Sequence, residues 1–271
     1  MGGFSAQWLE LREPFDSRAR SQELVIALGS LLPLRPLQVL DFGAGTGANV
    51  RYMAPLLEGR QHWQTLDNDR ELIARQPSQL ADERFECNVS PQHFDLAAGL
   101  ESLPLSGCQL VTASALLDLV SAAWLESLAF HCAALGLPAL FSLNYDGRVQ
   151  CLPEDPDDSW IIALVNRHQR LDKGFGPALG PDATSHACRV FESRGFQSRT
   201  TPSDWVIGPE GQSLQRELIA GWVAAACEMA PQEATCIEQW GKRRHAHAEA
   251  GRSRIQVGHQ DFLAWPKALC G

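Results

Sequence analysis

The sequence predicts an α/β fold: a doubly wound, mostly parallel seven-stranded sheet with helices on both faces. Up to Leu143, short apolar runs of strand length alternate with helical stretches, which is the pattern of a parallel sheet. Polar residues also stand at or just beyond the ends of the first five expected strands: Asp41, Asp67, Asp95, Ser114 and Asn144. In such sheets ligands bind outside the carboxyl ends of the strands, so these residues mark the expected binding edge.

The expected elements follow one another in the order of a doubly wound sheet. A helical stretch at 16–32 carries an apolar stripe and ends at Pro33. The expected strands are residues 37–42, 62–66, 93–96, 110–114, 138–143, 196–207 and 255–259. Helices are expected at 50–57, 122–135 and 182–195, and glycines end the last two.

Two insertions interrupt this alternation after the fifth strand. The first, at 146–181, contains an acid-rich helix start and an apolar helical stripe. It ends in three glycines that permit hinge motion: Gly174, Gly176 and Gly180. We therefore expect this segment to form a lid that supplies the pocket for a substrate. The second insertion, at 210–250, predicts two amphipathic helices.

Length and composition limit the possible classes of protein. The 271 residues suit one α/β domain with a small cap, and we expect a helical cap at 1–36 and the main domain at 37–271. A formal net charge of −9 argues against binding along a nucleic-acid backbone. No apolar run approaches a membrane span, and the eight cysteines show no zinc-site spacing. We predict a cytoplasmic monomer or homodimer without a metal, a disulfide or a membrane segment.

The most informative motif is the glycine turn after the first expected strand, Asp41-Phe42-Gly43-Ala44-Gly45-Thr46-Gly47. A strand, a glycine turn and a helix N-terminus together place backbone N–H groups beside a ligand. With Ala48 as its last position, the turn fits a dinucleotide loop. As an acid followed by three alternate glycines, it resembles motif I of the class I S-adenosylmethionine (SAM) methyltransferases. Asp41 favours the second interpretation, because a carboxylate repels a pyrophosphate and attracts the sulfonium and ammonium groups of SAM.

A second acid agrees with an adenosine cofactor. Residues 62–66 read as a strand, and Asp67 stands at its end, about twenty residues beyond the glycine turn. An acid at this distance holds the ribose diol in both cofactor families. Asp69 is expected to cap the helix that follows.

The chain resembles a seven-stranded class I SAM-dependent methyltransferase over about residues 37–262, and within that class a bacterial subgroup whose substrate is unsettled. The resemblance implies that the cofactor is held by Asp41, Gly43, Ala44, Gly45, Gly47, Asp67, Asn68, Asp95, Leu96 and Ser114. Asp67 would bind the ribose hydroxyls, Asn68 would lie along the adenine, and Asp95 would face the adenine amino group. Glu86 or Asn88 takes the place of Asp95 if the third strand starts earlier. The motif typical of nucleic-acid amino-methyltransferases is absent at residues 114–117, which favours a small-molecule acceptor.

Three residues are candidates for catalysis at the acceptor. Asp118 lies just beyond the fourth strand, where this fold places a residue near the transferring methyl group, although it also suits a helix N-terminus. Tyr145 follows the fifth strand and is positioned to line the acceptor pocket. His168 continues an apolar helical stripe, so it is either catalytic or a core residue. A base is needed only where the acceptor carries a proton.

The predicted function is therefore methyl transfer from SAM to an oxygen, nitrogen or carbon nucleophile of a small molecule by in-line displacement. Two alternatives remain open at this level. A SAM-binding protein without transfer activity would use the insertions as a partner surface. A nicotinamide-dependent oxidoreductase is disfavoured by Asp41 and by the spacing of the glycines.

Overall fold

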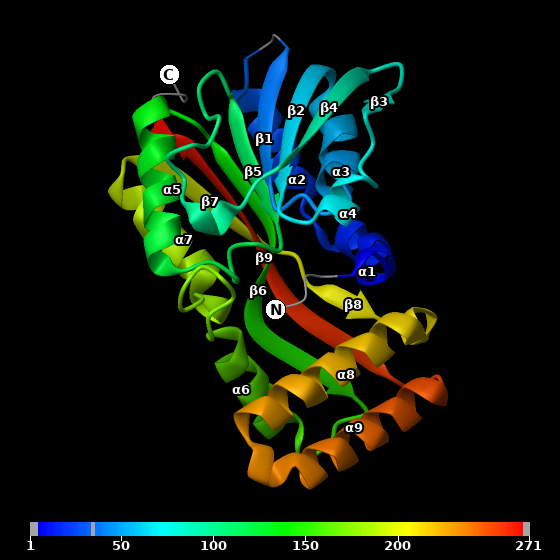
Figure 1. Cartoon of the computed structure of the whole chain (residues 1–271). Helices are drawn as coiled ribbons and strands as arrows, with labels where there is room; N and C mark the ends of the chain where they lie inside the picture. Colours follow the sequence, from blue (N-terminus) through cyan, green and yellow to red (C-terminus); the bar gives the residue numbers. More distant parts are fainter. Residues whose placement is uncertain (1–4, 34–35, 268–271) are drawn as a thin grey trace.

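The computed structural model describes residues 5–33 and 36–267 and contains one nine-stranded sheet (Figure 1). In spatial order its main path is β3 (Gln79–Ala81), β4 (Phe85–His93), β2 (Gly59–Asp67), β1 (Leu37–Phe42), β5 (Leu110–Ser114), β6 (Ala139–Leu152), β9 (Arg254–Pro266) and β7 (Phe196–Pro202). Strand β8 (Trp205–Ile207) also pairs with β9. Among the described strands, all but β3 and β9 run in one direction. The predicted fold class is confirmed, although the sheet has nine strands rather than seven.

Helices cover both faces of this sheet (Figure 1). On one face, α5 (Ala122–Leu135) and α7 (Ala183–Ser193) bury Leu128 and Phe191 in a core shared with β1, β5 and β6. On the other face, α2 (Gln22–Leu31) and α3 (Ala48–Leu57) bury Leu28 and Met53 against the sheet. The prediction for α5 is correct at both ends, because Ser121 caps its first turn and Gly136 adopts the left-handed conformation at its end.

A third core lies beyond the carboxyl edge of the sheet. This core is formed by the end of β6, the start of β9, β8, and three helices: α6 (Asp158–Gln169), α8 (Gln212–Met229) and α9 (Ala234–Glu249). We call these elements together the outer lobe. The outer lobe occupies the lower half of Figure 1. Trp222 and Trp240 pack within its core with their ring centroids 6.5 Å apart. The two helices predicted within 210–250 are α8 and α9.

The fifth predicted strand is much longer than expected. It was predicted to end at Leu143, but β6 continues to Leu152 because it pairs with β9 on the far side of two register shifts. Tyr145 and Asp146 therefore belong to a strand and not to the loop after it. The segment predicted as a lid accordingly begins inside β6 and continues through α6.

The third predicted strand is misplaced. Its prediction was 93–96, whereas β4 spans Phe85–His93 and pairs with β2 along its length. Phe85, Cys87 and Val89 are buried while the residues between them are exposed, which is the alternation of a half-buried strand. Glu86 and Asn88 pair in register with Arg60 and His62, near the start of β2. They lie at the amino end of the strands, so neither replaces Asp95.

Two smaller corrections concern the chain before β1 and the sixth predicted strand. The helix predicted at 16–32 is two helices, α1 (Ala6–Ala19) and α2, because Arg20 and Ser21 adopt extended conformations and Ser21 caps α2. The strand predicted at 196–207 is divided at residues 203–204 into β7 and β8, and both parts pair with β9.

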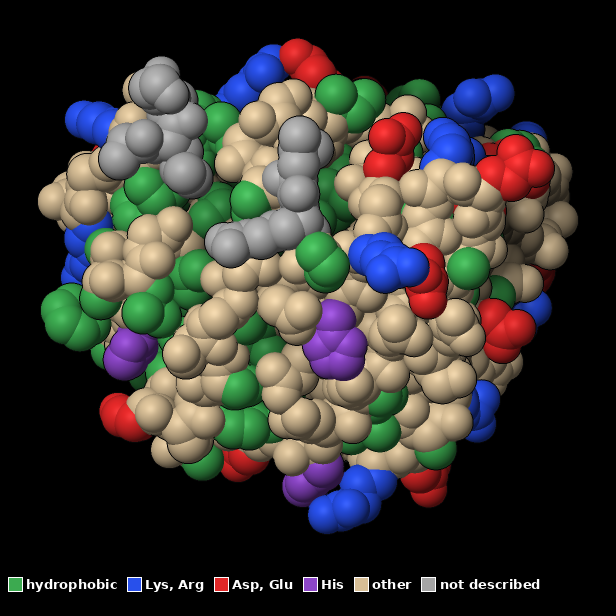
Figure 2. Space-filling view, turned by 90° about the horizontal axis from the view of Figure 1, so that it is seen from above, with side chains coloured by type: hydrophobic (Ala, Val, Ile, Leu, Met, Phe, Trp, Pro, Cys, Tyr) green, Lys and Arg blue, Asp and Glu red, His purple; other side chains and the backbone are tan. Residues whose placement is uncertain are grey.

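Figure 2 looks onto the end of the molecule where the parallel strands begin. On this face the Lys and Arg side chains are interspersed with Asp and Glu, and no basic track stands out among the described residues. Searching residues 5–33 and 36–267, we find no helix with the length and apolar character needed to cross a membrane.

Candidate functional site

The glycine turn connects β1 to α3 at the carboxyl edge of the sheet. Gly43, Gly45 and Gly47 have φ of +58°, +53° and +83°, the left-handed region where a side chain is strained. The Ala44 N–H donates to the Leu66 carbonyl, 3.0 Å away, so the turn is fixed to the neighbouring strand β2. Gly47 is the N-cap of α3. The backbone of the turn is thus held in one shape by interactions within β1, β2 and α3.

Asp67 ends β2 and reaches directly to this turn. Its carboxylate accepts a bond from the Gly45 N–H at 2.7 Å and another from the Asp69 N–H at 2.9 Å. The residue is 8% exposed. A carboxylate has about four lone-pair positions, so these two bonds leave capacity for two ligand hydroxyls. Asn68, the next residue, is exposed.

Asp41 lies beneath the turn in a buried polar network. Its Oδ1 accepts a bond of 2.6 Å from the Asn49 amide, while its buried Oδ2 has no hydrogen-bond partner among the described residues. Burial raises the pKa of Asp41 to about 7, although the bond from Asn49 and the charge of Arg20 oppose that rise. A buried carboxyl with one free oxygen favours a ligand that brings a donor or a positive charge.

Arg20 completes this network, although no sequence motif pointed to it. Its guanidinium donates to Asn49 Oδ1 at 2.9 Å and to the Ser114 hydroxyl, and it lies 4.9 Å from the centre of the Tyr52 ring. Burial lowers the pKa of Arg20. Arg20 belongs to the predicted N-terminal cap, and only the corner between α1 and α2 carries it to the ends of β1 and β5.

Two residues that are not glycine adopt strained conformations, one just beyond the end of β5 and one inside β6. Ala115 and Leu143 have φ of +53° and +57°. Each is held by a backbone N–H: Ala115 donates to the Ser142 carbonyl at 2.9 Å, and Leu143 donates to Asp261 Oδ1 at 2.8 Å. Conformations of this kind cost roughly 1–3 kcal/mol each and gather at functional sites. A third described residue of this kind, Glu58 with φ of +51°, lies at the other edge of the sheet, just before β2.

Asp118 follows Ala115 in the chain and is buried at 7% exposure. Its Oδ1 has no hydrogen-bond partner within the described chain, and the backbone N–H of Tyr145 donates to the carboxyl group. Burial raises the pKa of Asp118 to about 6, with the charge of Arg12 acting in the opposite direction. Asp118 is therefore an acid that titrates near neutral pH and has one oxygen free for a ligand.

Four aromatic rings from separate parts of the chain meet in what we call the aromatic cluster: Trp8, Tyr145, Trp205 and His259. Tyr145 connects the cluster to Asp118, whose charge acts on the Tyr145 phenol. The His259 ring centre lies 4.9 Å from Trp205 and 6.2 Å from Tyr145, and Trp8 lies 6.4 Å from Trp205. Helix α1, which contributes Trp8, packs against β8 (Figure 1). Of these four residues, only Tyr145 was predicted as a site residue.

The other predicted site residues lie as follows. Asp95 is exposed and caps a short 3-10 helix through the Ala97 N–H at 2.9 Å, while Leu96 is buried and its carbonyl accepts from the Trp124 indole at 2.9 Å. Tyr145 donates from its hydroxyl to Asn166 Oδ1 at 2.7 Å. His168, near the end of α6, contacts Glu228 at 3.0 Å and Lys173 at 3.4 Å, and its side chain is 21% exposed. Its partners belong to the outer lobe and the loop after α6, so the structure does not join it to Asp118.

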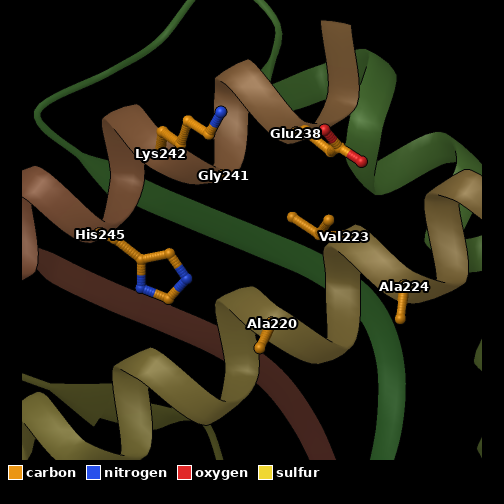
Figure 3. Close-up of a pocket in the computed structure, with 7 residues that line it drawn as sticks. All are labelled: Ala220, Val223, Ala224, Glu238, Gly241, Lys242 and His245. Atoms are coloured by element: carbon orange, nitrogen blue, oxygen red, sulfur yellow. The ribbon is translucent and has the colours of Figure 1, made fainter. Parts of the chain in front are cut away.

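A hollow of about 350 Å³ lies elsewhere, between α8 and α9 (Figure 3). It is lined by Ala220, Val223, Ala224, Glu238, Gly241, Lys242 and His245. These residues belong to the two helices of the outer lobe and include none of the strand-end residues. We assign no chemistry to it. Among the described residues, no group of three or more His, Cys, Asp or Glu side chains is arranged to hold a metal.

The chain resembles the class I SAM-dependent methyltransferases in its motifs and in its fold. A doubly wound sheet that carries the acid-glycine turn and Asp67 at its carboxyl edge is the architecture that this resemblance implies.

Comparisons with known proteins add description but no assignment. No family model matches the chain, and no curated protein matches it. Similar solved structures include a cyclopropane-fatty-acyl-phospholipid synthase-like protein from Lactobacillus casei, with a TM-score of 0.49, 12% identity, and coverage of 94% of this chain and 99% of that one. A SAM-dependent methyltransferase from Thiobacillus denitrificans in complex with S-adenosylhomocysteine (SAH) has a TM-score of 0.45, 12% identity, and coverage of 98% and 100%. The cyclopropane synthase MmaA2 from Mycobacterium tuberculosis has a TM-score of 0.45, 14% identity, and coverage of 88% and 82%. With identities and scores this low, the function must be inferred from the residues of this chain.

Proposed function

We propose that this protein transfers the methyl group of SAM to a small-molecule acceptor. The observation that carries the proposal is the arrangement around the glycine turn. Asp67 binds the turn through Gly45 and keeps lone pairs free, and Asp41 lies under the same turn with one unpartnered oxygen among the described residues. This arrangement suits a ligand that combines a ribose diol with a positive charge.

The residues present fit SAM group by group. Asp67 would hold the ribose hydroxyls, and the exposed Asn68 would lie along the adenine. Asp41 and Arg20, two opposite charges joined through Asn49, suit the ammonium and carboxylate groups of the amino-acid end. The remaining predicted contacts are Gly43, Ala44, Gly47, Asp95, Leu96 and Ser114.

The main task of the protein in methyl transfer is to position the acceptor atom relative to the methyl group. Bound SAM supplies an activated methyl group, and the protein must hold the acceptor atom about 3–3.5 Å away and in line with the bond that breaks. Such fixed approach contributes roughly 7–11 kcal/mol to lowering the barrier. The acceptor atom must present a free electron pair, so a residue that takes up a proton is needed only where that atom enters protonated, as in a hydroxyl, an ammonium group or an acidic carbon.

Among the three catalytic candidates, Asp118 fits the role of base best. It is buried beside the strained end of β5, and one of its oxygens lacks a partner within residues 5–33 and 36–267. Tyr145 suits positioning, because burial raises the pKa of its phenol and keeps its proton in place. His168 would act from the segment 146–181, for which we retain the predicted role of a lid. In this segment Gly174, Gly176 and Gly180 have φ of +104°, +85° and +53°.

Calorimetry tests the cofactor, and turnover tests the reaction. We expect SAM and SAH to bind in the micromolar range or tighter and NAD to bind far more weakly. Methyl-labelled SAM with a panel of metabolites should then yield a labelled product. SAM binding without transfer to any acceptor would favour the non-catalytic alternative, and tight NAD binding at the same edge would overturn the proposal.

A further inference from the structure

Three of the buried polar atoms that lack a partner among the described residues belong to segments at the junction between the sheet and the outer lobe. Within the described chain, the buried Oδ1 of Asp118, Oδ1 of Asn144 and Nε1 of Trp8 have no hydrogen-bond partner. Asn144 precedes Tyr145, whose N–H donates to Asp118, so the two free oxygens lie on neighbouring segments. Buried polar atoms are usually paired, and unpaired ones lose about the free energy of a hydrogen bond each. A ligand with hydrogen-bond donors would satisfy the two free oxygens.

The charged side chains at the junction indicate which ligand charge the site would favour. From α1, Arg12 reaches the junction, but Asp16 already binds it through two bonds of 2.9 and 3.2 Å. Arg12 also lies 5.1 Å from the centre of the Trp205 ring, whose indole N–H donates to Asp16. This cation is thus compensated and would give an anionic ligand little attraction.

His259, from β9, adds no charge to the junction. Its Nδ1 donates to the Val257 carbonyl at 3.0 Å, which leaves Nε2 without a proton in the neutral ring. Burial, followed by the charge of Arg12, lowers the pKa of His259 to about 3. The ring is therefore neutral near pH 7, and Tyr145 from β6 is neutral as well because burial raises its pKa. Asp118 remains as a carboxylate beside neutral aromatic rings.

A carboxylate beside aromatic rings is suited to an ammonium group. Aromatic faces attract cations through their quadrupole, and a buried carboxylate adds a charge-assisted hydrogen bond. Helix α1, which carries Trp8, lies against the glycine turn: a Cβ on Gly45 would lie 3.0 Å from Leu9 Cδ1. Glu13 also pairs with Arg51 of α3 at 2.7 Å, which fixes α1 over that turn.

We propose that the methyl acceptor is an amine, bound as its ammonium form between Asp118 and the aromatic cluster. This proposal rests on the proposed function and specifies its substrate class. In the reaction, an N–H bond of the ammonium group breaks and its proton forms an O–H bond with the Asp118 carboxylate. The free electron pair on nitrogen then forms the new N–CH₃ bond while the methyl–sulfur bond breaks and its electron pair stays on sulfur. The products are a methylated ammonium ion, SAH and protonated Asp118, which returns its proton to water.

Three probes of the same shape test the substrate class. They are 2-phenylethylamine, 2-phenylethanol and 3-phenylpropionate, each titrated calorimetrically into the full-length protein saturated with SAH. We expect the amine to bind at least about tenfold more tightly than the alcohol and the acid to bind more weakly still, since a charge-assisted bond to Asp118 is available to the amine alone. Equal binding of amine and alcohol would overturn the proposal.

Single substitutions test which side chains cause the preference for the amine over the alcohol. Asp118→Asn keeps the size of the side chain, and it should remove the amine preference while SAH binding stays within about twofold of the wild type. Trp8→Leu should weaken the amine about three- to thirtyfold and leave the alcohol nearly unchanged. Glu154→Gln, which removes an exposed acid of the outer lobe, is the control and should change neither probe. An amine preference that survives in Asp118→Asn would contradict the proposal, with melting curves confirming that each variant is folded.

The SAH titration separates the two levels of inference. Failure of SAH to bind the wild-type protein would remove the proposed function itself. Normal SAH binding with no preference for the amine would leave the proposed function intact and exclude only the amine acceptor.

Discussion

The glycine turn and the junction with the outer lobe both contain a buried carboxyl group with one oxygen unpaired among the described residues, Asp41 and Asp118, but their backbones differ. At the glycine turn, backbone N–H groups already have partners: Ala44 binds Leu66, and Gly45 binds Asp67. At the junction, Asp118 and Trp8 keep buried atoms without a partner among the described residues. A preformed backbone suits a cofactor of constant shape, whereas unpaired side chains suit a substrate whose donors complete the site.

The two regions also differ in how far apart their residues lie in the chain. The turn and Asp67 come from one stretch of fewer than thirty residues, and β1 and β2 pair directly. The aromatic cluster takes its members from α1, β6, β8 and β9, so it exists only when the outer lobe and α1 are both in place. Changes at the turn should therefore act on the cofactor, and changes at the junction should act on the acceptor.

The largest effect is expected from Gly45→Val. A β-branched residue at φ +53° is strongly strained, and its Cβ would lie 3.0 Å from Leu9 Cδ1, so α1 must shift as well. We expect SAM binding to weaken by about a hundredfold or more, corresponding to roughly 3 kcal/mol of distortion. Calorimetry measures the affinity. Gly29→Ala is the matched control, because nothing lies within 4 Å of the added Cβ in α2, and it should leave SAM binding unchanged. Affinity within threefold of the wild type in Gly45→Val would mean that the turn does not contact the cofactor.

Asp67→Ala should weaken SAM binding about ten- to a hundredfold, because charge-assisted bonds to the ribose contribute roughly 1.5–3 kcal/mol. The fold should persist, since the same carboxylate makes only two backbone bonds. Asp69→Ala provides the comparison: Asp69 caps α4 (Arg70–Ile73) through bonds of 2.8 and 3.2 Å. Its loss should reduce the free energy of unfolding by about 1 kcal/mol while SAM affinity is kept. Similar affinities for the two variants would show that Asp67 is not a cofactor ligand.

At the junction, Asp118 should make stability depend on pH. Burial raises its folded pKa to about 6 from an ordinary value of 3.8, so the folded state holds the proton to higher pH than the unfolded state. The wild-type protein should therefore lose stability from Asp118 as the pH rises from about 4 through 6, and Asp118→Asn should not. Asp41 titrates with the same sign, but it is present in both proteins and cancels in their difference.

The measurement is the free energy of urea unfolding of both proteins at pH 4 and pH 8. The advantage of Asp118→Asn over the wild type should grow by about 1–3 kcal/mol between these two values. A difference that is constant with pH would show that Asp118 is solvated in the folded protein, and the base role would lose its support.

The smallest effect is expected from His168→Ala. His168 connects α6 to Glu228 of α8 and to Lys173 in the loop that follows α6, so its loss should loosen the segment 146–181. We expect turnover to fall about two- to tenfold with SAM affinity unchanged, because the histidine does not contact the turn. A lower melting temperature with unchanged turnover per folded molecule would support the alternative that His168 only stabilises the outer lobe.

The glycine turn and the strand ends around it could be predicted from local sequence patterns. Strand β1, the glycine turn, the end of β2 at Asp67 and both ends of α5 are where periodicity and turn chemistry predicted them. Each depends on the conformation of a short segment: apolar runs form buried strands, and glycines take left-handed positions. The third strand was misplaced within the same region, although Phe85, Cys87 and Val89 alternate with polar residues in the pattern of a half-buried strand.

The residues that meet at the junction between the sheet and the outer lobe became visible only in the tertiary structure. Strand β6 runs on to Leu152 because β9, more than a hundred residues later, pairs with it, and no local pattern reports a partner at that distance. Arg20 and Trp8 reach the site through the corner between α1 and α2 and through the packing of α1 against β8. Local conformation depends mainly on neighbouring residues in the sequence. The pairing of distant segments depends on the free energy of the whole core, which sequence periodicity does not reveal.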